Sequence, residues 1–142
     1  MNYGFIKAAT ASPRVTVADC ESNTAEIIHA IDAAYERGVK LLCFPELCVC
    51  GYTCADLFFQ QTLLAASARA VRQIAEAARG KGMLLVVGFP FLHSGKIYNC
   101  AAVIFDGELL GIVPKTNIPN YSEFYECRHF ASAPEENVTV SF

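Results

Sequence analysis

Two charged side chains, Glu46 and Lys115, follow apolar stretches of the sequence and could do chemistry together. Glu46 lies in the Phe-Pro-Glu-Leu segment of residues 44–47, and Lys115 follows a proline at the end of a second apolar run. A carboxylate can act as a general base, and a fixed ammonium can stabilise an oxyanion. We therefore expect the two groups to share a pocket at the ends of neighbouring strands. The plainer alternatives are a solvated loop carboxylate or helix N-cap for Glu46 and a surface lysine for Lys115.

The residues before Glu46 predict a strand, a helix and a second strand. Residues 4–11 are largely apolar and predict the first strand. An amphipathic helix is expected to begin at the capping-box pattern Asn-Thr-Ala-Glu of residues 23–26 and to end at Gly38. Residues 39–44 form a near-continuous apolar run, which is typical of a strand buried on both faces. Glu46 is then expected just beyond the carboxyl end of this strand.

The second half of the chain predicts a helix, a strand and a hairpin. Residues 62–79 are rich in alanine with apolar residues at helical spacing, and residues 83–89 follow as another buried strand. Residues 97–105 and 108–113 flank an Asp-Gly dipeptide at 106–107, which favours a two-residue type I′ turn. Strands that alternate with helices predict an α/β fold with parallel strands, and the hairpin adds antiparallel strands at one side.

The composition excludes several classes of protein. With 54% hydrophobic and 18% charged residues the chain is expected to fold, and so rich an apolar content suggests surfaces for a partner or for a missing remainder of the domain. Eleven Lys and Arg are scattered among fourteen acidic residues, so no nucleic-acid partner is expected. No window reaches the roughly eighteen apolar residues of a membrane span. The start, residues 1–4, lacks the features of a signal peptide, and we expect a cytoplasmic protein with no membrane partner.

The seven cysteines, without a secretory signal, indicate free thiols in a reducing compartment. Four of them lie close to Glu46 in the sequence: Cys43, Cys48, Cys50 and Cys54. Their spacing matches no paired Cys-x-x-Cys zinc motif, so no metal site is expected. Cys100 and Cys127 could act as nucleophiles beside His93 or His129, but nothing in the sequence brings them together. We interpret the cysteines as structural thiols.

The segments around Glu46 and Lys115 resemble two motifs of the nitrilase, or carbon–nitrogen hydrolase, superfamily. Residues 44–58, Phe-Pro-Glu-Leu-Cys-Val-Cys-Gly-Tyr-Thr-Cys-Ala-Asp-Leu-Phe, resemble its glutamate motif, and residues 114–130 resemble its lysine motif. Within them, Gly-Tyr-x-x-x-Asp-Leu-Phe and Pro-Asn-Tyr-x-x-Phe-x-Glu-x-Arg-x-Phe are similar to the glutaminase domain of the glutamine-dependent NAD synthetases. The resemblance runs from Tyr3 onward and covers about the first half of that domain.

This resemblance implies an α-β-β-α sandwich, here only about its first half, and an amidase in which a cysteine thiolate attacks a carboxamide. It assigns Glu46 as the general base and Lys115 as the group that stabilises the oxyanion. Glu126 matches a second glutamate that orients the lysine or polarises the site, and Tyr52 and Tyr121 match positions that bind the substrate. The plainer alternatives are an exposed ion pair for Glu126 and a core aromatic for Tyr52.

The family's nucleophile lies in a Cys-Glu-Asp-x-Trp context, and no cysteine of this chain has it. Residues 1–142 are therefore expected to be a partial glutaminase domain that ends before the nucleophile and is inactive alone. The resemblance implies glutamine as the substrate, a homo-oligomer, and no cofactor in this chain. ATP and magnesium would serve a synthetase domain, which is absent from this chain and which would amidate nicotinic acid adenine dinucleotide to NAD.

Two other interpretations stay open at this point. One is a free-standing amidase of the same superfamily that acts on another small amide, of the ω-amidase or carbamoylase type. The other is a module without catalytic activity that serves assembly.

Overall fold

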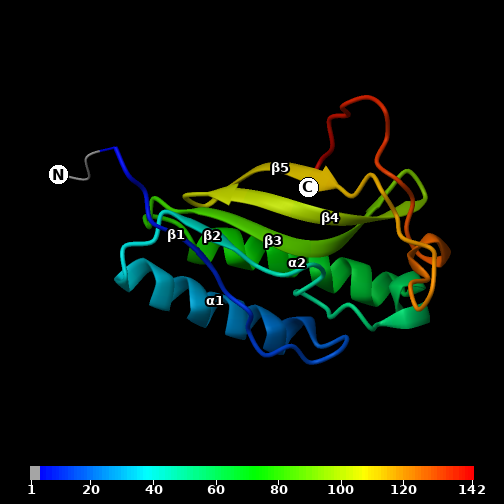
Figure 1. Cartoon of the computed structure of the whole chain (residues 1–142), viewed down its shortest axis with the longest axis horizontal. Helices are drawn as coiled ribbons and strands as arrows, with labels where there is room; N and C mark the ends of the chain where they lie inside the picture. Colours follow the sequence, from blue (N-terminus) through cyan, green and yellow to red (C-terminus); the bar gives the residue numbers. More distant parts are fainter. Residues whose placement is uncertain (1–3) are drawn as a thin grey trace.

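The fold is built on one five-stranded sheet whose strand order follows the sequence. The computed structural model describes residues 4–142. Strands β1 (Ala8–Thr10), β2 (Leu41–Cys43) and β3 (Leu84–His93) pair in parallel, and β4 (Lys96–Phe105) and β5 (Glu108–Pro114) continue the sheet in antiparallel pairing. Figure 1 shows β1 and β2 at one edge and β5 at the other. The predicted α/β fold with an antiparallel addition is confirmed.

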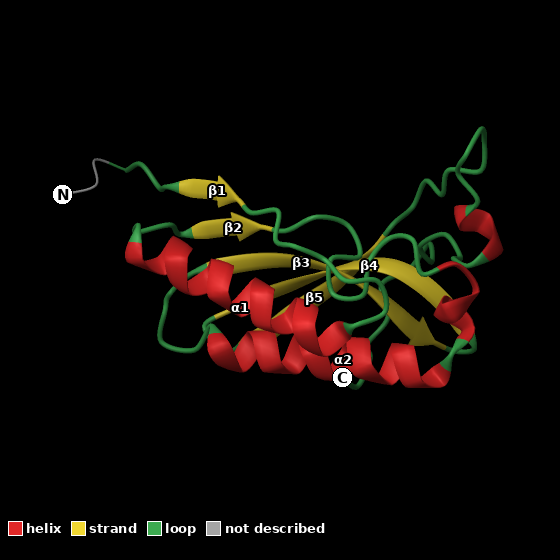
Figure 2. Cartoon of the chain, turned by 90° about the horizontal axis from the view of Figure 1, so that it is seen from below, coloured by secondary structure: helices red, strands yellow, loops and turns green. Residues whose placement is uncertain are grey.

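Two long helices, α1 (Cys20–Glu36) and α2 (Gln61–Ala77), cover one face of this sheet, as Figure 2 shows from below. Helix α1 begins three residues before the predicted capping box. Its N-cap is Asp19, whose side chain accepts a hydrogen bond from the Ser22 amide at 3.0 Å. Asn23 is instead buried and holds the preceding loop through the Thr16 backbone and the Val49 carbonyl. The predicted start was wrong because Asn23 serves tertiary structure; the predicted stop at Gly38, which has φ +73°, is confirmed.

Residues 39–44 and 83–89 were predicted to form strands buried on both faces. This prediction was wrong, because the strands are buried on one face only. Burial alternates along residues 41–44 and 83–87, because every second side chain points toward the helices. The side chains on the helix side form the core and are almost completely buried: Leu42, Leu85, Val87, Ala102 and Ile104. Within residues 4–142 only one helical layer covers the sheet, so the continuous apolar pattern reflects a second face that this part of the chain leaves open.

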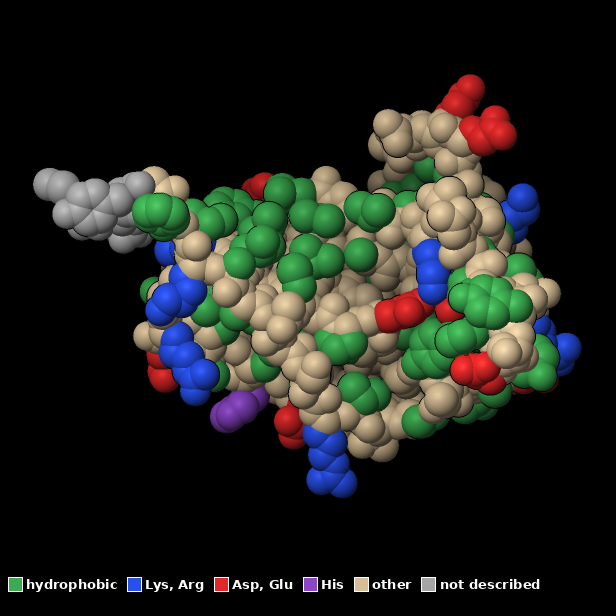
Figure 3. Space-filling view, viewed as in Figure 1, with side chains coloured by type: hydrophobic (Ala, Val, Ile, Leu, Met, Phe, Trp, Pro, Cys, Tyr) green, Lys and Arg blue, Asp and Glu red, His purple; other side chains and the backbone are tan. Residues whose placement is uncertain are grey.

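The face of the sheet away from the helices carries partly exposed apolar side chains. The register places on this one face Leu41, Cys43, Leu84, Val86, Ala101, Val103, Phe105 and Val113. Phe105 is 43% and Val113 57% exposed, and Figure 3 shows the hydrophobic side chains gathered over the strands. We call this set the open sheet face. An apolar face of this kind is typical of a sheet that packs against a second sheet in a sandwich.

Two tight hairpins join the antiparallel strands. The predicted turn between β4 and β5 has positive φ at both Asp106 and Gly107, as a type I′ turn requires. The turn between β3 and β4 uses Ser94 and Gly95 in the same way and was not predicted. It extends β3 to His93, four residues beyond the predicted end at Phe89. The long strands β3 and β4 extend the sheet beneath the loops that hold the candidate site.

Among residues 4–142 no helix combines the length and the apolar character needed to cross a membrane. The expectation that the chain has no signal peptide concerns residues 1–4, of which residues 1–3 lie outside the described residues.

Candidate active site

The loop after β2 carries Glu46 across β3. Phe44 still pairs with β3, since its amide donates to the Val86 carbonyl at 2.9 Å, and the Val49 amide donates to the Gly88 carbonyl at 3.3 Å. Between these two anchors the chain turns through Leu47, which has φ +51°. The loop thus moves Glu46 from the end of β2 toward β4 and β5.

Gly88 in β3 permits this crossing. A Cβ atom on Gly88 would lie 2.9 Å from the carbonyl carbon of Glu46 and would also collide with the Leu47 amide nitrogen. Real Cβ atoms do not approach backbone so closely, so any side chain at this position would push the loop off the sheet. The missing side chain of Gly88 therefore decides how near Glu46 comes to the other strands.

Lys115 follows the last residue of β5 and is fixed by β4. Its amide donates to the Asn99 carbonyl at 2.8 Å, which extends the pairing of the two strands by one residue. Strands β2 and β5 are separated by β3 and β4, so the expectation that Glu46 and Lys115 follow neighbouring strands was wrong. They meet because the Glu46 loop crosses β3 and the Glu46 side chain reaches Asn99 of β4 and Lys115 after β5.

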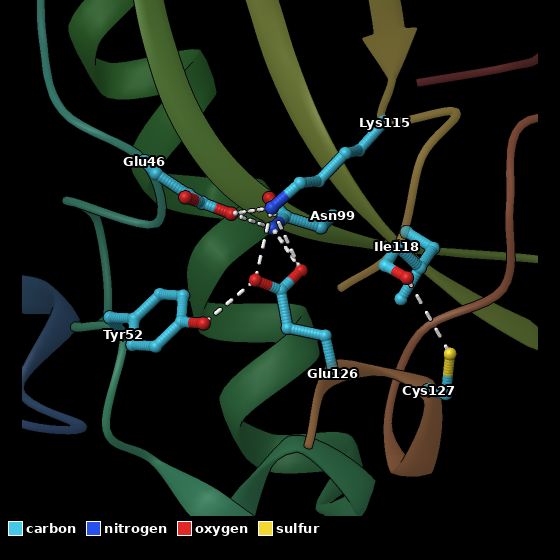
Figure 4. A network of polar contacts seen from close by, with 7 residues as sticks. All are labelled: Glu46, Tyr52, Asn99, Lys115, Ile118, Glu126 and Cys127. Atoms are coloured by element: carbon cyan, nitrogen blue, oxygen red, sulfur yellow. Dashed lines mark hydrogen bonds and ion pairs between the residues drawn. The ribbon is translucent and has the colours of Figure 1, made fainter. Parts of the chain in front are cut away.

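Five polar side chains meet in one network, drawn in Figure 4: Glu46, Tyr52, Asn99, Lys115 and Glu126. Lys115 Nζ lies 2.7 Å from Glu46 Oε1 and 3.0 Å from both Glu126 carboxylate oxygens. The expectation that the charged atoms of Glu46 and Lys115 lie within a hydrogen bond is met. The catalytic roles of these residues stay predictions.

Glu126 enters the network from the short 3-10 helix η2 (Glu126–Arg128) and is only 5% exposed. The alternative of an exposed ion pair is therefore wrong. A buried carboxylate is costly unless it is paired and hydrogen-bonded, and Glu126 is bonded to Lys115, to the Tyr52 hydroxyl at 2.7 Å and to Asn99 Nδ2 at 3.4 Å. Burial alone would lower the pKa of Lys115, but the bonds and charges of the two glutamates outweigh it and raise the pKa above its usual value. Lys115 is therefore charged at neutral pH.

Tyr52 connects the Glu46 loop to Glu126. Tyr52 is 39% exposed and its hydroxyl donates to Glu126, so the alternative of a plain core aromatic is wrong. Burial of the hydroxyl, its bond to Glu126 and the nearby negative charges raise the pKa of Tyr52 well above its usual value. Tyr52 therefore keeps its proton at neutral pH and donates it to Glu126.

Asn99 is the site residue that sequence reasoning missed. It is 4% exposed in β4, and its Nδ2 donates to Glu46 Oε1 and to Glu126 Oε2. A polar side chain in the apolar run of residues 97–105 was the available signal. Asn99 donates to both carboxylates and, together with the Lys115 ammonium, offsets the repulsion between them.

Tyr121 does not join the network. It is 68% exposed, packs against Phe124 with ring centroids 5.5 Å apart, and makes no hydrogen bond to the five network residues among those described. Its role in substrate binding stays a prediction.

Glu46, Asn99 and Lys115 line a shallow cleft of about 250 Å³ on the open sheet face, with Val86, Ala101 and Val113 as its apolar wall. A larger groove of about 940 Å³ lies elsewhere, between α2, β5 and the segment of residues 133–142. The polar groups in that groove do not converge: Arg72 lies over the Phe142 ring at 5.4 Å, and His93 stacks on Phe91. The smaller cleft is the candidate site because its polar groups meet at one point.

The cysteines take no part in this network. Their thiol hydrogen bonds within residues 4–142 go to backbone carbonyls or, for Cys20, to Ser67, and none goes to Glu46 or Lys115. Cys100 faces the helix side of β4, where burial raises its pKa to about 12. Cys127 contacts the Ile118 carbonyl at 3.8 Å, and His129 bonds to Asp56 instead. No group of metal-ligating side chains was found in the described part of the chain.

The arrangement offers a carboxylate and an ammonium that face one small cleft, with a second carboxylate and an amide behind them. Glu46 is the most accessible carboxylate of the network, with a side chain 41% exposed, and could take a proton from a group that enters the cleft. The Lys115 ammonium, 29% exposed, could donate to a developing oxyanion beside it. This combination suits acyl transfer from a small carbonyl compound.

Comparison with known proteins places the chain in a family. The sequence profile described as carbon–nitrogen hydrolase matches residues 7–139. The glutamine-dependent NAD(+) synthetase of Mycobacterium bovis is 36% identical over 138 residues, which are 97% of this chain and 20% of the relative. The chain thus spans about a fifth of the length of the curated relatives it matches.

Solved structures give the same picture of the fold. A glutamine-dependent NAD(+) synthetase from Cytophaga hutchinsonii superposes with a TM-score of 0.88 at 30% identity and covers 94% of this chain and 23% of its own. An amidase from Nesterenkonia sp. superposes with a TM-score of 0.75 at 25% identity and covers 96% of this chain and 51% of its own. Glu46, Lys115 and Glu126 lie within the span that the profile matches.

Proposed function

The chain belongs to the carbon–nitrogen hydrolase family, and we propose that it is part of a glutaminase domain in which Glu46, Lys115 and Glu126 act on a carboxamide. The observation that carries this proposal is the contact of Lys115 Nζ with Glu46 at 2.7 Å and with Glu126 at 3.0 Å. A general base and an oxyanion donor must both reach one carbonyl centre, and these two groups can.

The proposed reaction uses a cysteine thiol that a further segment of the complete protein supplies. Glu46 takes the thiol proton as sulfur attacks the amide carbon, and the Lys115 ammonium stabilises the negative oxygen of the tetrahedral intermediate. The carbon–nitrogen bond then breaks, the proton passes from Glu46 to the departing nitrogen, and ammonia leaves a thioester. Glu46 next takes a proton from the water that hydrolyses the thioester, which releases glutamate and the free thiol.

The proposed parent is a glutamine-dependent NAD synthetase. Residues 1–142 would form the first part of its glutaminase domain, and the ammonia would serve the ATP-dependent amidation of nicotinic acid adenine dinucleotide in a separate synthetase domain. The similarity to such synthetases over 97% of this chain supports this assignment. ATP and magnesium belong to that domain in this proposal. Glutamine is the only ligand that we assign to the present residues.

A free-standing amidase is the second candidate, favoured by the fold that the chain shares with the Nesterenkonia amidase. The two candidates differ in what the ammonia is used for, so the complete protein distinguishes them. A synthetase makes NAD from nicotinic acid adenine dinucleotide with either glutamine or ammonium salts as the nitrogen source. A free-standing amidase makes none from either.

The test is Glu46→Gln in the complete protein, with NAD formation measured from glutamine and, separately, from ammonium chloride. We expect glutamine-dependent synthesis to fall by about a hundredfold or more, since the general base is lost, while ammonium-dependent synthesis is unchanged. Lys115→Ala should give the same pattern. Glu123→Gln is the matched control, because it makes the same substitution at an exposed glutamate of the segment between Lys115 and η2.

Three results would count against the proposal. If the Glu46→Gln protein uses glutamine at the full rate, Glu46 is not the general base. A complete protein that forms NAD from neither nitrogen source but releases ammonia from a small amide is the free-standing amidase. A complete protein that does neither is a non-catalytic assembly module.

A further inference from the structure

Two short 3-10 helices far apart in the sequence are joined beside the candidate site. In η1 (Ala55–Phe59) and η2, Asp56 and Arg128 form a two-point ion pair, with Nε to Oδ1 and Nη2 to Oδ2 both at 2.8 Å. His129 Nε2 lies 3.3 Å from the same Oδ1. Seventy-two residues separate Asp56 from Arg128, so this contact is purely tertiary.

Aromatic side chains pack beside this contact between η1 and η2, which we call the junction. The His129 ring lies 5.5 Å from the Phe58 ring and 5.4 Å from the Phe59 ring, and Phe130 contacts Phe58 edge-on at 4.8 Å. Phe58 and Phe130 are 1% and 6% exposed. Buried aromatic side chains therefore pack against the segments that carry Asp56 and Arg128, and they restrict the orientation of η2 relative to η1.

The junction lies next to two residues of the network in the sequence. Glu126 precedes Arg128 by two residues in η2, and the Glu126 carbonyl accepts from the His129 and Phe130 amides at 2.9 and 2.8 Å. Tyr52 precedes η1 by three residues, and its hydroxyl bonds to Glu126. Asp56 and Arg128 thus link the two segments that carry Tyr52 and Glu126.

On its far side η2 is tied to β4, because the Ala131 amide donates to the Ile97 carbonyl at 2.9 Å, but the chain that leads into η2 gives Glu126 no such support. Residues 115–125, between β5 and η2, form neither helix nor strand. An exposed ion pair adds little to stability in general, and Asp56 and Arg128 have side chains 63% and 61% exposed. The pair can instead fix the orientation of η2 relative to η1, because a two-point contact between a guanidinium and a carboxylate sets orientation as well as distance.

We propose that Asp56, Arg128 and His129 form a clamp that holds Glu126 against Lys115 and Tyr52. These three are positioning residues: they touch neither the cleft nor the charged atoms of Lys115. The proposal rests on the proposed amidase function, because the clamp matters for activity only if Lys115 must be held in place by Glu126.

The test uses Asp56→Asn and Arg128→Gln in the complete protein, with glutamate release from glutamine as the assay. We expect kcat to fall about tenfold or more in each variant with little change in KM, since a small misplacement of a catalytic group costs rate. The double variant should be no worse than either single variant. The reversed pair, Asp56→Arg with Arg128→Asp, should recover part of the loss.

The matched control is Glu76→Gln on α2. It removes another exposed two-point pair, in which Arg79 Nη2 lies 2.8 Å and Nε 3.0 Å from the Glu76 carboxylate, far from the network in the sequence. This variant should keep its kcat. An equal loss of kcat in Glu76→Gln and Asp56→Asn, or an unchanged kcat in Asp56→Asn, would overturn the clamp.

A crystal structure of the Asp56→Asn protein separates the clamp from the proposed function. The clamp predicts that Glu126 leaves hydrogen-bond distance of Lys115 or Tyr52, whether or not the protein hydrolyses glutamine. Contacts of Glu126 that remain at 2.7 and 3.0 Å in the variant overturn the clamp alone. Should Asp56→Asn fail to fold, Arg128→Lys, which keeps the charge but not the two-point contact, is read by the same criteria.

Discussion

Gly88 lies directly beneath the backbone of Glu46, so close that a Cβ atom on the glycine would come within 2.9 Å of the Glu46 carbonyl carbon. The position of the proposed base is therefore decided by the absence of a side chain in a neighbouring strand. Gly88→Ala should displace the Glu46 loop and lower stability by about 1–3 kcal/mol, the range for overpacking a well-packed site.

The measurement for Gly88→Ala is chemical denaturation followed by circular dichroism, combined with glutamine hydrolysis by the complete protein. Gly111→Ala in β5 is the control, because nothing lies within 4 Å of a Cβ atom there. Equal stability and activity for the two variants would show that the loop does not depend on Gly88.

Asn99→Ala should reduce glutamine hydrolysis although Asn99 is not one of the charged residues. Its Nδ2 bridges Glu46 and Glu126, and without it the two carboxylates are held together by Lys115 alone. We expect kcat to fall about tenfold or more, because Glu46 would lose one of the two hydrogen bonds that orient its carboxylate. Steady-state kinetics test this, with Gln73→Ala, an exposed amide on α2, as the control.

Lys115→Met should destabilise the protein by about 3–5 kcal/mol, since it leaves the Glu126 carboxylate buried without a cation. Replacing both partners, Lys115→Met with Glu126→Gln, should cost less than Lys115→Met alone. Denaturation of the two single variants and the double variant gives the coupling free energy. A double variant that costs the full sum would mean that the two groups do not interact.

The Asp56 clamp should respond to acid. Its bonds with Arg128 and then with His129 lower the pKa of Asp56 from 3.8 to about 2. A lowered pKa means that the folded state binds the proton less well, so the contribution of Asp56 to stability is present above pH 3.8 and is lost as the pH falls toward 2. The difference in melting temperature between the parent protein and Asp56→Asn should therefore shrink over this range. A difference that is constant from pH 5 to pH 2 would contradict the assigned shift.

The 142-residue chain expressed alone should self-associate through the open sheet face, where Phe105 and Val113 are exposed. Exposed contiguous apolar surface of this kind favours association in water. Sedimentation at tens of micromolar and binding of a hydrophobic dye measure it, and Val113→Lys should reduce both. A compact monomer that binds no dye would contradict the prediction.

The sequence alone predicted the order of elements and the two charged residues that meet. Local signals carry this information: helical periodicity in residues 62–79, the Asp-Gly turn at 106–107, and apolar runs that end at Glu46 and Lys115. The family motifs added Glu126 and Tyr52. Both lie in the network, although the sequence left an exposed ion pair and a core aromatic open for them.

Only the tertiary structure decided how these residues come together. Strands β2 and β5 are not neighbours, and the contact between Glu46 and Lys115 needs a loop that crosses β3 over Gly88. Asn99 and the Asp56 clamp were not predicted, because a single polar residue in a strand and a pair separated by 72 residues have no local signature. Sequence patterns report the periodic burial of each element, whereas a polar network depends on atoms brought together from distant segments, and that is settled only when the sheet and its loops are assembled.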